Sequence, residues 1–284
     1  MGVWRTVADF VREVIQRWQR DNATTQGAAL AYYTLFSVAP LLVLVIILAG
    51  LVLGRAAAQG QVFTHIQDLV GPDTARTVEE MVRRASTPRA GIVPTVVSLA
   101  AVLFGASSLI GQLRGSLNHI WGVSARGGGV RGMIRQRAIA LGVIGGIGLL
   151  LLASMALSAV LAAVQQIVTQ HLPLLGPLLV WADAGLSLLV AIAFFALVFR
   201  FVPDTPLGWR ELWPGAAMTA LLFTVGKSLI GLYLGRAATT SIYGAAGSLV
   251  LLLLWVYYSA QILLLGAVFT GVYARRSAST GPGA

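Results

Sequence analysis

The ionisable side chain best suited to binding chemistry is Lys227, the only lysine in the chain, which lies in the apolar run ALLFTVGKSLIGLYLG at residues 220–235. An ammonium group inside a membrane helix is costly and by default marks a functional site. Asp183, in PLLVWADAGLSLLV, is the only acid inside any apolar span. We predict that the two side chains pair in the outer half of a helical bundle. The pair either contacts an anionic substrate or only fixes how two helices pack.

A second polar group surrounds a proline. The apolar run GAALAYYTLFSVAPLLVLVIILAG has Pro40 at its centre, preceded by Tyr32, Tyr33 and Ser37. Proline removes one backbone hydrogen bond and bends a helix, so the freed carbonyl groups can face a cavity. Broken helices mark binding sites in many transporters, although a proline bend is also ordinary in helix bundles. We therefore place these four residues with the charged pair in one predicted substrate site.

The same inventory disfavours hydrolytic and metal chemistry. The chain has no cysteine, and its three histidines, His65, His119 and His171, fall in three separate loops. Metal-dependent cleavage of a phosphodiester requires clustered carboxylates or histidines. None of the motifs HExxH, GxxxxGK[ST] and GxSxG occurs in the sequence. We predict no enzymatic activity, no metal site and no cofactor.

The composition indicates that these residues are carried by membrane helices. Hydrophobic residues make up 57% of the 284 positions and charged residues 11%, against about 25% charged residues in a soluble domain. Several apolar runs reach the roughly 20 residues that cross a bilayer core, without the alternation of a membrane barrel. The predicted fold class is all-α, a polytopic membrane protein with a six-helix bundle. The six predicted spans are residues 28–54, 92–111, 137–164, 177–200, 212–235 and 245–273.

The distribution of arginine predicts the orientation of this bundle. With six spans, 13 arginines lie on the side of the two termini and six on the other side. Cytoplasmic loops carry the excess of positive charge, so both termini are predicted to be cytoplasmic. The net charge of +10 is then explained by these loops, and nucleic acid is not an expected partner.

Two amphipathic segments flank the first span. Residues 1–27 are predicted to form a cytoplasmic helix at the membrane interface, because apolar and charged side chains alternate at helical spacing. Residues 55–91 repeat this pattern and are predicted to form a small helical external loop, interrupted by GPD at 71–73 with Asp73 as an N-cap. Residues 28–273 would form the transmembrane domain and residues 274–284 a flexible cytoplasmic tail.

The loop after the second predicted span is basic. The stretch GQLRGSLNHIWGVSARGGGVRGMIRQR, residues 111–137, holds five arginines and no acid. Within the predicted loop 112–136 and at its end, Arg126, Arg131, Arg135 and Arg137 are candidates for contact with anionic lipid head groups. The same charges are also explained by topology alone.

Four stretches carry a resemblance to a known family. They are ALAYYTLFSVAPLL (29–42), GASSLIGQLRGSLNHIWGV (105–123), FRFVPDTPLGWRELWPGA (199–216) and GKSLIGLYLGRAATTSIYGAAGSLVLLLLWVYYSAQILLLGA (226–267). On these residues the chain resembles the YihY or virulence-factor BrkB family of bacterial inner-membrane proteins. The resemblance implies six membrane helices with cytoplasmic ends, and Lys227 fits the family's GK in the fifth span.

The resemblance also has limits. Members of the family were once labelled ribonuclease BN, a label regarded as misassigned, and the family has no settled biochemical activity. Many members read Gly-Ala-Glu where this chain has Gly266, Ala267 and Val268. If that acid serves as a proton or ion site, this chain lacks it, so a coupling mechanism cannot be transferred from the family.

These observations lead to one leading function and two alternatives. The leading prediction is an inner-membrane protein that transports or exports an anionic or amphiphilic, lipid-like molecule of the cell envelope. The alternative is a non-transporting scaffold for envelope integrity, and a ribonuclease is a distant third. The expected partners are membrane lipids, anionic ones included, and self-association into a homo-oligomer is compatible with the sequence.

Overall fold

The computed structural model describes residues 2–53, 55–86, 108–123, 176–204, 207–237 and 247–279, together with single positions between residues 138 and 157. All regular elements in these ranges are helices, which agrees with the predicted all-α class. They are α1 (Gly2–Arg20), α2 (Ala23–Leu53), α3 (Arg55–Val70), α4 (Pro72–Ser86), α7 (Gly176–Phe201), α8 (Trp209–Ala237) and α9 (Gly247–Ser279), with a further helix over residues 108–121.

Two of the described helices are long and apolar enough to cross a membrane, judged by length and composition. The qualifying segments are Ala184–Phe201 in α7 and Leu249–Ser277 in α9. The predicted spans 28–54 and 212–235 coincide with α2 and α8. Spans 92–111 and 137–164 lie mostly outside the described residues. The count of six spans therefore stays a prediction.

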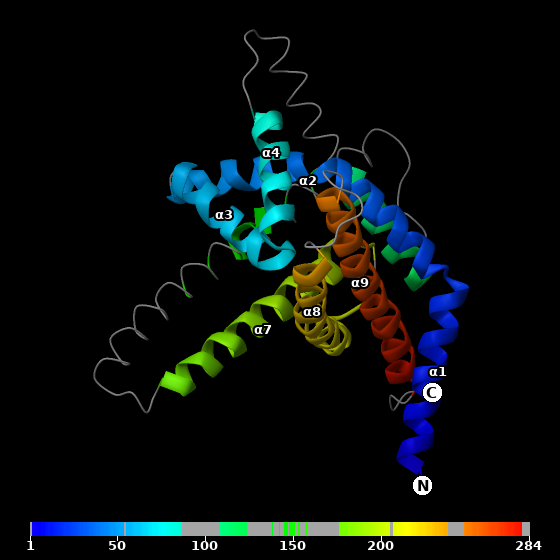
Figure 1. The fold of residues 1–284 in the computed structure, drawn as a ribbon. Coiled ribbons are helices and arrows are strands. Elements are labelled where there is room, and N and C mark those ends of the chain that lie inside the picture. The colour runs from blue at the N-terminus through cyan, green and yellow to red at the C-terminus, as the bar shows by residue number, and fades with distance from the viewer. Residues whose placement is uncertain are drawn as a thin grey trace.

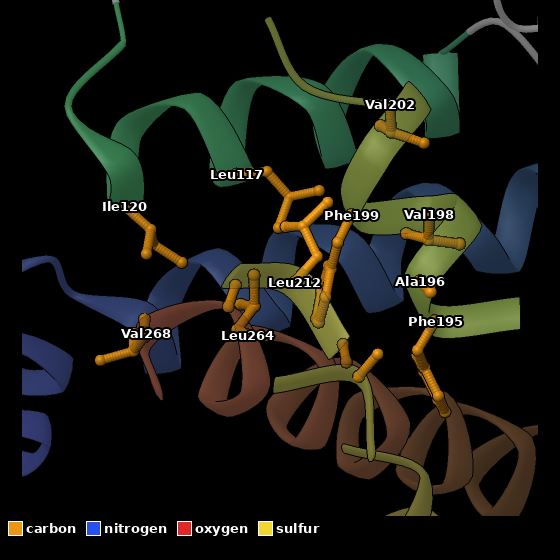
Figure 2. Close-up of a cluster of buried hydrophobic side chains, with 14 of the residues drawn as sticks. Leu117, Ile120, Phe195, Ala196, Val198, Phe199, Val202, Leu212, Leu264 and Val268 are labelled. Carbon is orange, nitrogen blue, oxygen red and sulfur yellow. The ribbon is translucent and has the colours of Figure 1, made fainter. Parts of the chain in front are cut away.

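Helix α9 is the central element of the described bundle. It packs against α1, α2, α4 and α8, and α7 packs on the far side of α8 (Figure 1). A large cluster of buried apolar side chains joins α1, α2, α7, α8 and α9 to helix 108–121 (Figure 2). Leu117, Phe199, Leu212 and Leu264 are among its members and are almost fully buried. Because lipid is as apolar as these side chains, close packing rather than escape from water holds such a cluster together in a membrane.

The contact between α8 and α9 is closest at two glycines. Thr270 of α9 lies directly over Gly215 of α8, and Thr219 of α8 lies over Gly266 of α9. Each threonine donates its hydroxyl to the carbonyl four residues earlier, Thr219 to Gly215 at 2.6 Å and Thr270 to Gly266 at 2.7 Å. The two helices are thus antiparallel, and glycine lets their backbones approach with the hydroxyl groups satisfied.

Helices α3 and α4 form a hairpin whose turn is Gly71. Gly71 has φ of 80°, which glycine adopts without strain. Its amide donates to Gln67 and ends α3, while its carbonyl accepts from Ala75 and begins α4. Helix α4 starts at Pro72, a residue well suited to the first helical position. The expectation that Asp73 caps this helix is wrong, because Asp73 lies inside the helix and Gly71 takes the capping position.

The end of α4 distant from this turn is charged and exposed. Arg83 and Arg84 each donate hydrogen bonds of 2.7 Å to the carboxylate of Glu80. The hydrogen bonds from Arg83 and then Arg84 lower the pKa of Glu80 to about 2. Glu80 therefore stays ionised at physiological pH, and this end of the hairpin is suited to water.

Candidate functional site

The predicted site residues of α2 differ in burial and do not share one environment. Ser37 is buried, and its hydroxyl donates to the carbonyl of Thr34 at 3.3 Å. Tyr32 and Tyr33 are exposed, and their rings meet edge to face with centroids 5.9 Å apart. Helix α2 continues through Pro40. Ser37 thus completes the local hydrogen bonding of its helix, while the two tyrosines present aromatic surface.

The predicted charged pair involves two neighbouring helices. Lys227 is exposed on α8, and Asp183 belongs to α7, which packs against α8. The side chain of Asp183 lies outside the described residues, so the pair stays a prediction. Among the described contacts, none joins Lys227 to the tyrosines or the serine of α2.

The four arginines predicted to contact anionic lipid, Arg126, Arg131, Arg135 and Arg137, also lie outside the described residues. Their role stays a prediction as well.

A groove of about 450 Å³ lies between α1 and α8 and has α9 as its floor. Ile15 and Trp18 form one wall, Leu222 forms the opposite wall, and Gln261 and Leu265 are part of the floor. The volume falls in the range of about 300–1,000 Å³ that is usual for ligand pockets. The described lining contains no charged side chain, so the groove is suited to an apolar chain and not to a free anion.

The floor of the groove offers a few polar groups. The amide nitrogen of Gln261 donates to the carbonyl of Thr24 at 3.1 Å, and it lies so close to Gly27 that a methyl group there would displace the glutamine side chain. The amide oxygen of Gln261 is buried and has no hydrogen-bond partner among the described residues. Tyr258, also on the floor, lies against Gly226 of α8. This set of groups can orient a bound molecule by hydrogen bonds but supplies no nucleophile or general base.

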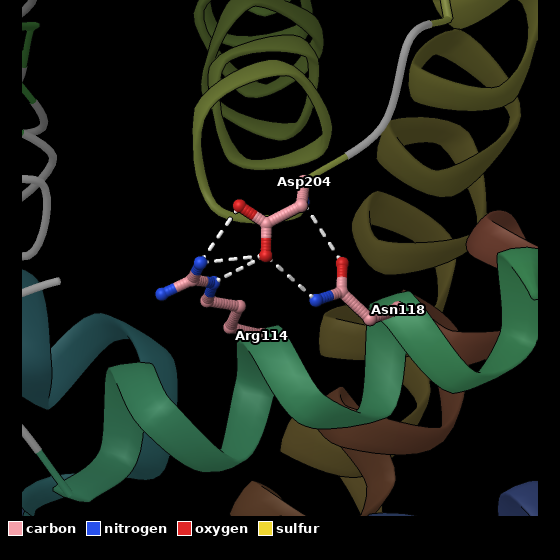
Figure 3. Close-up of polar contacts among 3 residues, drawn as sticks. All are labelled: Arg114, Asn118 and Asp204. Carbon is pink, nitrogen blue, oxygen red and sulfur yellow. Dashed lines mark hydrogen bonds and ion pairs between the residues drawn. The ribbon is translucent and has the colours of Figure 1, made fainter. Parts of the chain in front are cut away.

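The strongest polar contact among the described residues lies elsewhere, where helix 108–121 meets the turn after α7 (Figure 3). Arg114 donates from Nη2 to both carboxylate oxygens of Asp204 at 2.7 and 2.6 Å and from Nε at 2.9 Å. Asn118 donates to the same carboxylate at 3.0 Å and accepts from the Asp204 amide at 2.8 Å. The side chains of Arg114 and Asp204 are only 12% and 4% exposed. We call these three residues the Asp204 cluster.

Further contacts hold the same end of the molecule. Trp121 donates its indole nitrogen to the carbonyl of Ala267 at 2.8 Å, which ties helix 108–121 to α9. Arg276 of α9 pairs with Glu13 of α1 at 2.9 Å. Val268, at the position where the family resemblance implies an acid in many members, is 1% exposed within the apolar cluster. An acid at this position in this chain would be surrounded by apolar side chains.

The Asp204 cluster was missed by reasoning from the sequence, which counted Arg114 only as a topological charge in a loop without acids. The acid comes from a segment 90 residues later. The available signal was the spacing of Arg114 and Asn118, which four residues apart share one face of a helix. Within the described residues no group of three histidine, aspartate or glutamate side chains could hold a metal ion.

Comparison with known proteins places these features in context. The model of a family described as virulence factor BrkB matches residues 14–284. A UPF0761 membrane protein of Verminephrobacter eiseniae is 32% identical over 94% of this chain and 62% of the relative. UPF0761 membrane proteins of Alkalilimnicola ehrlichii and Pseudomonas aeruginosa are each 29% identical, over 98% and 92% of this chain and 62% and 61% of the relatives. The chain thus spans just over three fifths of the length of these relatives. No solved structure matches the chain.

Proposed function

The chain belongs to the virulence factor BrkB family, and from this premise we propose that it moves an anionic or amphiphilic, lipid-like molecule of the bacterial cell envelope. In this proposal it is a multi-pass protein of the inner membrane with six spans and both termini in the cytoplasm. The relatives are named membrane proteins without a stated activity. The proposal therefore rests on the groove and its surroundings.

The observation that carries the proposal is the apolar groove between α1 and α8. Its walls match the acyl portion of a lipid, and a few polar groups on α9 can orient the polar portion. It is partly open, so a chain could enter sideways from the bilayer. A strictly water-soluble substrate would leave most of this surface without a matching contact.

Helix α1 supports contact between the groove and the membrane interface. Phe10 and Val14 face the bundle, while Val7, Val11 and Ile15 form an exposed apolar row beside them. A helix with this pattern and several arginines can lie at the head-group level of a bilayer. The groove would then open close to the interface, where lipid-like molecules enter and leave.

Lys227 supplies the positive charge that the groove lacks. It is exposed on α8, five residues after Leu222, which is about 7.5 Å along the helix axis and about 140° around it. The long lysine stem can carry its ammonium several ångströms from the backbone toward an anionic head group. In this proposal the acyl chain occupies the groove and the anionic head meets Lys227, with Asp183 as the resting partner of the lysine.

The test is mass spectrometry of the lipids that co-purify with the protein in mild detergent. Leu222→Trp fills the groove and should remove a specific amphiphile that the parent protein retains. Leu189→Trp makes the same change on the exposed surface of α7 and should retain it. Lys227→Ala should lower retention of anionic species selectively.

Identical, non-selective lipids in all four proteins at matched folded yield would refute transport through the groove. That outcome would favour the scaffold, in which the same helices only pack and the surfaces bind envelope partners.

A further inference from the structure

The turn of the α3–α4 hairpin contacts α8 at its middle and α9 about a quarter of the way along its length. Val70 and Ala75, on the two sides of Gly71, are buried with Trp255 of α9, and Phe223 of α8 packs on the same cluster. Phe223 is the middle residue of α8. Trp255 lies eight residues after the start of α9, about 12 Å along that helix. The turn therefore reaches well inside the bundle instead of resting on its outer end.

The hairpin is also held along its length. Val82 of α4 is buried with Val43 and Ile46 of α2, and Val62 and Phe63 of α3 pack against this second cluster. Figure 1 shows the turn pointing toward α8 and α9 while α2 passes along the other side of the hairpin. One face of the hairpin thus packs on helices that the sequence assigns to the membrane, while Gln67, Arg76 and Glu79 are exposed.

The hairpin has an apolar face and a charged face. Val70 and Ala75 form the apolar side of the turn that contacts α9, while Asp68, Asp73 and Arg76 belong to the same stretch of sequence. Glu80, Arg83 and Arg84 lie at the opposite, exposed end.

Both arms are helical, and Gly71 uses its own amide and carbonyl in the bonds that end one helix and begin the next. A non-spanning segment can enter a membrane bundle only when its backbone groups are satisfied and it is buried in protein or faces a water-filled cavity. The two helices satisfy the backbone of this hairpin, and protein covers the face with Val70 and Ala75. The face with Arg76 and Glu79 is exposed and requires water.

The hairpin and the groove share one residue. Tyr258 packs on the cluster formed by Val70, Ala75 and Trp255, and it also lines the groove. Farther along α9, Ile262 continues the floor of the groove on the side away from the hairpin. The turn therefore stands at one end of the groove, next to Tyr258.

We propose that the α3–α4 hairpin is a re-entrant gate that closes the outer end of the groove. In the closed state Val70 and Ala75 cover Trp255 and Tyr258, and exchange of cargo toward the outer side requires the turn to withdraw. Among the described residues of the turn only Val70 and Ala75 are buried in the apolar cluster with α9, and elements that move during function are held by few contacts. The role in cargo exchange rests on the proposed function, whereas the position of the hairpin does not.

The absence of cysteine in the sequence makes a sensitive test available. Ile262→Cys places a single thiol on the groove floor, and its labelling by a membrane-impermeant maleimide is measured from the outer side of right-side-out vesicles. Val70→Ala weakens the turn and should raise the labelling rate several-fold. Val82→Ala is the matched control, since it makes the same change in the same hairpin but at the contact with α2. It should leave the rate unchanged.

Equal labelling rates with and without Val70→Ala would overturn the gate. A second measurement covers the case in which Val70→Ala does not fold. In the double variant Val70→Cys and Trp255→Cys, a short membrane-permeant bismaleimide should join the two thiols within one chain, because the two positions share one buried cluster. The absence of this cross-link would overturn the re-entrant position. Neither readout requires cargo, so a protein that retains no amphiphile would refute transport while the gate is still judged by labelling and cross-linking.

Discussion

At the scale of single residues, the Asp204 cluster is the contact with the greatest consequence for stability. Its carboxylate receives hydrogen bonds from Arg114 and Asn118, which precede it by 90 and 86 residues. A buried charge is tolerated when an opposite charge and further hydrogen bonds satisfy it, and it becomes strongly unfavourable once its partner is removed. The cluster therefore locks helix 108–121 onto the turn that joins α7 to α8.

The change Asp204→Asn should destabilise the protein by about 3 kcal/mol, because it preserves the shape of the side chain but leaves Arg114 buried without its counter-charge. The measurement is thermal unfolding of the purified protein in mild detergent. Glu80→Gln removes the acid of an exposed ion pair and should leave the unfolding midpoint nearly unchanged. If Asp204→Asn unfolds together with the parent protein, the cluster does not stabilise the fold.

At the scale of elements, helices α8 and α9 are joined by a reciprocal arrangement of glycine and threonine. A methyl group on Gly215 would overlap the hydroxyl of Thr270, and one on Gly266 would overlap the hydroxyl of Thr219. Small residues permit close approach of membrane helices, where packing is a main source of association energy. The groove depends on this contact, since Leu222 and Tyr258 come from the same two helices.

We therefore expect Gly215→Ala to lower the free energy of unfolding by roughly the 1–3 kcal/mol typical of overpacking. The measurement is the unfolding temperature of the purified protein in mild detergent, which should fall. The double variant Gly215→Ala with Thr270→Ala should recover part of this loss, because the obstructing hydroxyl is removed. Gly185→Ala in α7 is the control, since nothing lies within 4 Å of the added methyl group. It should be neutral or slightly stabilising, as alanine favours a helix more than glycine. A harmless Gly215→Ala would show that α8 and α9 are less closely packed than described.

At the scale of the whole molecule, the two termini lie at one end of the described bundle. Figure 1 shows the N- and C-terminal ends together, and Glu13 of α1 pairs with Arg276 of α9. This arrangement agrees with an even number of spans. That this end is cytoplasmic follows from the arginine distribution, 13 against six, and stays a prediction.

Single cysteines test this orientation in the cysteine-free chain. An impermeant maleimide added to intact spheroplasts should label Glu79→Cys, which is exposed on α4, and should leave Ser277→Cys on α9 unlabelled until the membrane is permeabilised. The physical reason is that positively charged segments are retained on the cytoplasmic side. Labelling of Ser277→Cys before permeabilisation would reverse the predicted orientation.

The sequence by itself determined the helical class, the membrane environment and the family, because apolar run length, charge distribution and motifs are local properties of the chain. Lys227 was identified by the same local contrast, as one ammonium in an apolar run. Only the tertiary structure decided that Asp204 meets Arg114, that Tyr258 and Leu222 border one groove, and that the turn at Gly71 lies at the middle of α8. Each of these contacts joins residues far apart in the chain. They depend on which helix faces pack together, and neither hydropathy nor residue spacing along one segment specifies that choice.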